Sequence, residues 1–132
     1  MVAGVDVTRL DISPNPALMA AELNLEVDFK LSEPVEGACW RVKYTVDMTE
    51  MKFVVEVGET EKKNYEAGAH TMRFHSDGIA LGDVKKSWLN NVGLLTASLT
   101  SREEDIAQIC AVTQVTKGAD GELQRRMMSP LE

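Results

Sequence analysis

Hydrophobic and polar residues alternate strictly along residues 22–31 of this chain. Leucine, valine and phenylalanine occupy the odd positions from Leu23 to Leu31, and charged residues or asparagine occupy the even positions. Successive side chains of an extended backbone point to opposite sides, so the alternation predicts a strand with one buried and one solvated face. Residues 40–48 repeat the pattern, with Trp40 and Tyr44 among the apolar positions. Both segments therefore belong in a sheet that covers a core on one side.

Similar apolar runs, separated by turn signals, predict further strands at residues 5–12, 53–57, 69–75, 92–100 and 106–115. Residues 79–90 lack a clean periodicity, and we expect an irregular connection there. About seven short strands without a convincing long helix indicate an all-β protein, an immunoglobulin-like antiparallel β-sandwich. We expect a single domain over residues 1–117 and a loosely ordered C-terminal tail over residues 118–132.

The predicted hairpin of residues 92–115 is unusual because apolar residues occupy both of its faces. Its odd positions, such as Leu95, Ala97 and Leu99, are expected to face the core. Its even positions form a candidate partner-binding surface, which consists of Val92, Leu94, Ile106, Gln108, Cys110 and Val112. A strand pair that is apolar on both sides must be covered twice or must expose a patch. The alternative is that residues 79–90 or the tail, with Trp88, Met127 and Met128, fold over this face.

The net charge limits the classes of partner. The formal charge of −7 argues against direct binding of nucleic acid, which requires lysine and arginine to neutralise phosphates. It is compatible with a basic protein partner. The first residues lack the basic start and apolar stretch of a signal peptide, and no segment has the ~20 apolar residues that span a bilayer. We therefore expect an intracellular protein without membrane contact.

The sequence contains few candidates for bond chemistry. No nucleophile elbow, phosphate-binding loop or zinc-protease motif is present, so we expect neither an enzyme nor a cofactor. The two histidines, His70 and His75, are expected to be ordinary surface residues, and no metal site is expected. Glu26 and Asp28 share the polar face of their strand, where solvated charges are expected. Cys39 and Cys110 lie in apolar runs and are expected to be free, buried thiols.

Several motifs in series resemble the anti-silencing function family of histone chaperones, from about Val5 to Val115. They are Asn15-Pro16 after the first strand, the strand ending in Val27-Asp28-Phe29, Trp40 with the strand through Tyr44, Ala67-Gly68-Ala69-His70 leading into Met72-Arg73-Phe74, Asp77, and the hairpin from Val92. The resemblance implies an elongated immunoglobulin-like sandwich whose last two strands bind histone.

The residues that carry histone binding in that family are only partly matched. Leu94 keeps an aliphatic position, but an arginine and two tyrosines expected on the last strand fall near Gln108, Ala111 and Val112. Val54 and Trp88 stand where the resemblance implies carboxylates. A divergent relative that kept the scaffold and changed its partner fits this pattern.

The leading hypothesis is a non-enzymatic protein-interaction module that binds a protein through the outer face of the hairpin. One alternative is a histone chaperone that binds core histones. The other is a carrier of a small ligand or lipid, with a cavity between the sheets lined by Leu23, Leu25, Trp40, Val42 and Phe74.

Overall fold

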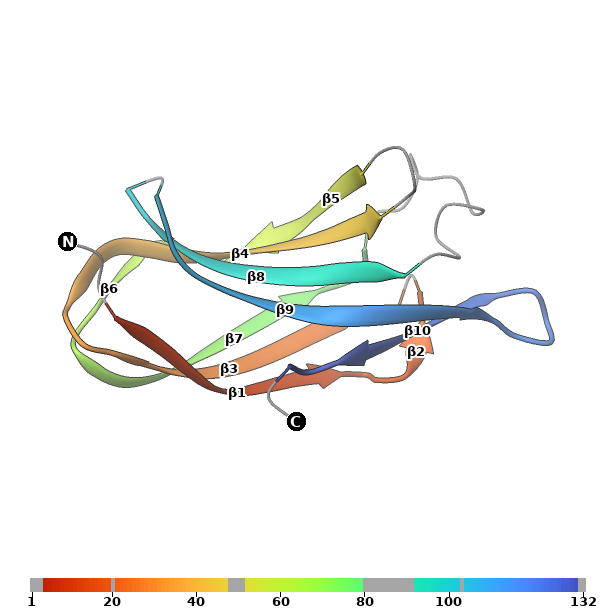
Figure 1. Ribbon diagram of the computed structural model, residues 1–132, viewed down its shortest axis with the longest axis horizontal. Helices are drawn as coiled ribbons and strands as arrows, with labels where there is room; N and C mark the ends of the chain where they lie inside the picture. The colour runs from red at the N-terminus through yellow and green to blue at the C-terminus, as the bar shows by residue number, and fades with distance from the viewer. Residues whose placement is uncertain (1–3, 20, 48–51, 80–91, 103, 131–132) are drawn as a thin grey trace.

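The chain folds into β-strands that form two antiparallel sheets (Figure 1). The computed structural model describes residues 4–19, 21–47, 52–79, 92–102 and 104–130. Within these residues there is no helix, and hence none long and apolar enough to cross a membrane. The strands are β1 (Val5–Ser13), β2 (Ala17–Leu18), β3 (Leu23–Leu31), β4 (Val35–Asp47), β5 (Lys52–Glu59), β6 (Lys63–Tyr65), β7 (Gly68–Ser76), β8 (Gly93–Ser101), β9 (Glu104–Lys117) and β10 (Leu123–Met128).

Strand order separates the chain into a small and a large sheet. The three-stranded sheet has the order β1-β3-β7, and the larger sheet has the order β2-β10-β9-β8-β4-β5, with β6 also paired to β4. Every segment predicted to be a strand contains one, so the prediction of an all-β protein with antiparallel sheets is confirmed. The connection predicted at residues 79–90 falls, apart from Ile79, outside the described residues.

The two sheets share one hydrophobic core, as expected for a β-sandwich. On β3 the odd residues from Leu23 to Leu31 are at most 4% exposed, whereas none of the even ones is buried. On β4, Trp40 and Tyr44 are fully buried, and the Trp40 ring meets Phe29 of the opposite sheet edge-on with a centroid distance of 5.2 Å. Period-two alternation on both strands thus produces the two inner faces.

One close approach inside the core requires a glycine. Gly93 of β8 lies against Tyr44 of β4, and a Cβ built on Gly93 would be 2.0 Å from Tyr44 Oη. Tyr44 is fully buried, and desolvation raises the pKa of its hydroxyl to about 12. Only a residue without a side chain leaves room for this ring.

The C-terminal segment differs from the expected loose tail, because Leu123–Met128 form β10 and extend the larger sheet beside β9. Three inward residues, Leu123, Arg125 and Met127, are at most 7% exposed. An arginine at the central inward position interrupts the apolar pattern by which a buried strand is recognised in sequence.

Arg125 is buried because backbone carbonyls take the place of a carboxylate partner. Its Nη1 donates to the carbonyl oxygens of Met19 and Ala21, each at 3.0 Å, and its Nη2 donates to that of Glu22. Desolvation lowers the pKa of the guanidinium, although an arginine remains charged. Arg125 therefore fixes the chain before β3 against β10.

Asn15 closes the free edge of β10 next to this point. Its Nδ2 donates to the Met127 carbonyl at 2.7 Å, and its Oδ1 accepts from the Met127 N–H at 2.9 Å. The side-chain amide thus makes the two hydrogen bonds that a neighbouring strand would make. We call this pair the Asn15–Met127 clamp.

Candidate functional site

The outer face of the larger sheet contains most of the surface predicted from the hairpin. The parity assigned to β8 is correct, because Leu95, Ala97 and Leu99 are at most 3% exposed and face the core. Leu94 points the other way and pairs with Val112 of β9. Leu94 is half-buried, and Val112 is 44% exposed.

Strand register places these two residues in a line that crosses five neighbouring strands. Leu94 pairs with Thr45 of β4, which pairs with Val54 of β5, while Val112 pairs with Met128 of β10. Val54, Val112 and Met128 are 51%, 44% and 38% exposed. Four strand spacings of about 4.8 Å make the line roughly 19 Å long. We call Val54, Thr45, Leu94, Val112 and Met128 the apolar row.

Polar residues predominate on both sides of the apolar row, although the exposed Val92, two residues before Leu94, also adjoins it. On one side, register aligns Glu56, Lys43, Thr96 and Cys110 across β5, β4, β8 and β9. On the other side, Gln114 pairs with Arg126 across β9 and β10. An apolar strip with a polar border is the usual appearance of a protein-interaction surface.

Cys110 lies within the border of the row and is only partly buried, which differs from the expectation of two buried thiols. Its Sγ lies 3.6 Å from Thr96 Oγ1. Cys39, in contrast, is 1% exposed, and its Sγ lies 3.4 Å from Thr100 Oγ1. Both thiols are free, as expected.

Of the remaining predicted site residues, Gln108 and Val92 lie near the apolar row, whereas Ile106 does not. Gln108 lies on the same outer face, opposite Ser98, and Val92 precedes β8 with 57% of its surface exposed. Ile106 does not join them. Register shifts after Leu99, so that Ala107 pairs with Leu99 while Asp105 pairs with Thr100, and Ile106 packs against the core. Strict alternation cannot anticipate a residue inserted in this way.

Sequence reasoning missed the two ends of the row, Val54 and Met128. Both reach it through pairing of strands, and Met128 does so through a strand that was expected to be part of the tail. Within the described residues the tail continues the sheet beside the hairpin and does not fold over its face, and Trp88 lies outside the described residues. Leu123 and Met127 share the parity of an inward face, but Arg125 between them interrupts the apolar alternation that would have revealed Met128.

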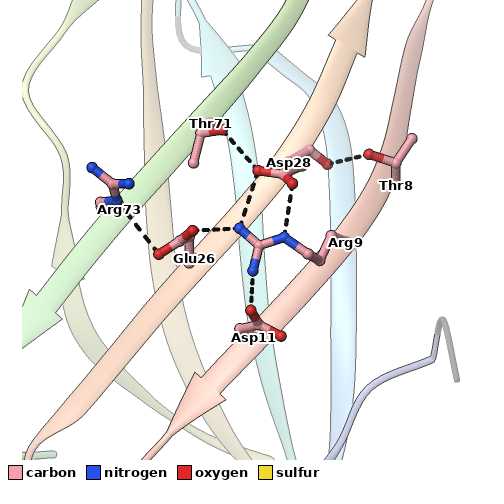
Figure 2. A network of polar contacts seen from close by, with 7 residues as sticks. All are labelled: Thr8, Arg9, Asp11, Glu26, Asp28, Thr71 and Arg73. Atoms are coloured by element: carbon pink, nitrogen blue, oxygen red, sulfur yellow. Dashed lines mark hydrogen bonds and ion pairs between the residues drawn. The ribbon is translucent and has the colours of Figure 1, made fainter.

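The exposed face of the smaller sheet carries a network of charges (Figure 2). Arg9 of β1 donates to Asp28 at 2.7 Å and also contacts Glu26 and Asp11. Hydrogen bonds from Arg9 are the main cause that lowers the pKa of both Asp28 and Glu26. A lowered pKa makes a carboxylate a weaker base. Glu26 and Asp28 therefore form part of a solvated ion network, as expected from the alternation of their strand.

Within the described residues, no group of three or more histidine, cysteine or acidic side chains is arranged to hold a metal ion. His70 Nε2 lies 2.6 Å from the Glu66 carbonyl oxygen, and His75 Nε2 lies 3.1 Å from Asp77 Oδ1. These are contacts of ordinary surface histidines.

Neither a protein-family model nor a curated protein matches this sequence. Function must therefore be inferred from the surfaces themselves, and among the described residues three of the five exposed large apolar side chains lie in the apolar row.

Proposed function

We propose that this chain is a non-enzymatic protein-interaction module whose binding surface is the apolar row. One observation carries the proposal. Four large apolar side chains, three of them more than a third exposed, align across five strands in a single register line. Isolated exposed apolar residues are common, but an aligned set with a polar border is not.

The dimensions of the row favour an amphipathic helix of a protein partner. About 19 Å corresponds to roughly 13 residues at 1.5 Å per residue. Apolar side chains three and four positions apart in a helix are about 5 Å apart along its axis, which matches the spacing between strands. A helix lying across the strands would place successive turns over Val54, Thr45, Leu94, Val112 and Met128, with apolar residues over the four apolar members of the row.

The scaffold proposed for this surface is an immunoglobulin-like sandwich of the anti-silencing type. Two antiparallel sheets with a shared core support it, as do the motifs that run in series from Asn15-Pro16 to the hairpin. Histones are the second candidate partner, favoured by the net charge of −7 and by the aliphatic Leu94. Capture of core histones that persists at moderate salt would support this candidate, because nonspecific charge attraction is screened.

The test compares proteins captured from native lysate by wild type and by variants with a charge on the row. Leu94→Arg and Val112→Arg should keep the fold, with a loss of stability within about 1 kcal/mol as for most surface changes. They should lose the partner, because an unpaired charge in an apolar interface is costly. Leu18→Arg is the matched control, since Leu18 is 50% exposed but lies on β2 outside the row.

Identification of the shared partner is followed by titration of its isolated segment against the same proteins. A partner that binds wild type and Leu18→Arg but neither row variant supports the proposal. A partner that binds all four proteins equally places the binding surface elsewhere. Unfolding of Leu94→Arg and Val112→Arg would mean that the row is covered by this chain itself.

A further inference from the structure

The outer edge of β5 ends the larger sheet at one side. Among the described residues no strand pairs with that edge, and β5 forms the upper border of the sheet in Figure 1. An uncovered edge presents unpaired backbone N–H and C=O groups, to which another strand can add. Natural proteins protect such edges, so an edge that no described strand covers calls for an occupant.

The half of β5 before its bulge is suited to pairing. Register shifts between Val42 and Lys43, which leaves Val57 as an extra residue between Gly58 and Glu56. A bulge of this kind twists an edge and blocks pairing. Residues 52–56 precede the bulge and read Lys-Phe-Val-Val-Glu, a β-prone segment without proline or glycine and with balanced charge.

This segment is complementary to itself. Antiparallel pairing of two copies about Val54 sets Val54 opposite Val54 of the second copy, and position 52 opposite position 56. The sequence has lysine at 52 and glutamate at 56, so this register sets a basic sequence position against an acidic one on both sides of the central valines. Pairing about Val55 would set Val54 against Glu56, and pairing about Glu56 would set two glutamates together. Pairing about Phe53 would set Lys52 against Val54, so the register about Val54 is the one that matches both the apolar and the charged sequence positions.

The same register would join the apolar rows of the two copies. Val54 is 51% exposed and ends the apolar row on β5. A second copy paired about Val54 would continue the row across the two-fold axis, onto Thr45 and Leu94 of that copy. We propose that β5 is a homodimerisation edge at which a second copy of this chain adds in antiparallel register about Val54. The inference goes beyond the proposed function, since it concerns pairing of a second copy at the sheet edge, where Val54 is shared with the apolar row.

The contact is short, with five residues from each copy, so the dimer should be in exchange with the monomer. Sedimentation velocity of the full chain over a concentration series should therefore show a shift from monomer to dimer. Val54→Lys should remain monomeric throughout the series. Leu18→Lys should dimerise like wild type, because it changes an equally exposed apolar residue away from the edge.

Two further sets of variants test the register itself. Lys52→Glu should abolish the dimer by setting glutamates opposite each other, and Lys52→Glu combined with Glu56→Lys should restore it. Val54→Cys, made together with Cys110→Ser, should form a disulfide-linked dimer under mild oxidation, whereas Leu18→Cys in the same background should not. The crosslink remains informative if Val54→Lys proves to be misfolded by circular dichroism.

Three results would overturn the proposal: a wild-type chain that stays monomeric at every concentration, a dimer that persists in folded Val54→Lys, or equal crosslinking of Val54→Cys and Leu18→Cys. A dimer that Leu94→Arg disrupts but Val54→Lys does not would also reject the edge, and would instead place the second copy on the face. None of these results depends on whether a foreign partner binds the apolar row.

Discussion

Replacing Gly93 by alanine tests the packing between β8 and β4 most directly. The new Cβ would lie 2.0 Å from Tyr44 Oη and 2.4 Å from Cζ, whereas carbon atoms in favourable contact are about 3.5–4.0 Å apart. Tyr44 is fully buried, so its ring cannot move into solvent without breaking the core. The strands must separate or the ring must leave its rotamer.

Two effects of opposite sign determine the result. Inserting a methyl group into a packed core costs about 1–3 kcal/mol and occasionally more. Glycine within a strand is in turn less favourable than alanine by about 0.5–1 kcal/mol, which the substitution recovers. An overlap of more than 1 Å lies at the severe end of the first range. We therefore expect Gly93→Ala to lower the free energy of unfolding by about 2 kcal/mol or more.

Urea unfolding followed by tryptophan fluorescence measures this loss, and Tyr44→Phe provides a second variant. Within the described residues Tyr44 Oη is buried without a hydrogen-bond partner, so its removal should cost little. The double variant Gly93→Ala/Tyr44→Phe lacks Tyr44 Oη, the atom nearest to the new Cβ, but keeps Cζ. Part of the stability lost in Gly93→Ala should therefore be recovered, which corresponds to a coupling free energy of about 1 kcal/mol between the two substitutions. Wild-type stability of Gly93→Ala, or strictly additive effects, would refute the close approach.

Three further predictions concern the core, the thiols and the charged face. Trp40→Ala should destabilise by roughly 3–5 kcal/mol, because the side chain is fully buried; urea unfolding of this variant is followed by circular dichroism, since the buried tryptophan is gone, and an unchanged midpoint would contradict the prediction. A thiol reagent should label Cys110 faster than Cys39 in the native protein, while both should react rapidly in denaturant; equal native rates would place both thiols in the same environment. The pKa of Asp28 is lowered by Arg9, so its stabilisation is present above the unfolded pKa of about 3.9 and is lost as the pH falls through the folded value. Thermal midpoints between pH 5 and 2 should fall less steeply for Arg9→Met than for wild type, and parallel curves would exclude the network as the cause.

The fold could be predicted from the sequence where burial follows the period of the strand. Alternation on β3 and β4 identified both inner faces, because each strand has one buried side and one solvated side. It failed at β10, where the central inward residue is Arg125. A buried arginine satisfied by backbone carbonyls has no signature in a hydropathy pattern, since its acceptors come from a distant part of the chain.

The candidate site could be predicted only in its centre. Leu94 and Val112 belong to one hairpin, so local parity was enough to place them on the same face. Val54 and Met128 join them through strands that are neighbours in space, and strand order is a non-local property. The bulge at Ile106 removed a predicted member, because one extra residue changes the parity of everything beyond it.

The Asn15–Met127 clamp also bears on chemical ageing of the protein. Asparagine usually deamidates when the backbone nitrogen of the next residue attacks its side-chain carbonyl, and conversion to aspartate would remove the Nδ2 donor to Met127. Residue 16 is proline, whose backbone nitrogen carries no hydrogen, so this cyclisation route is closed to Asn15. The amide that covers the edge of β10 is therefore protected by its own neighbour from the commonest spontaneous loss of an asparagine.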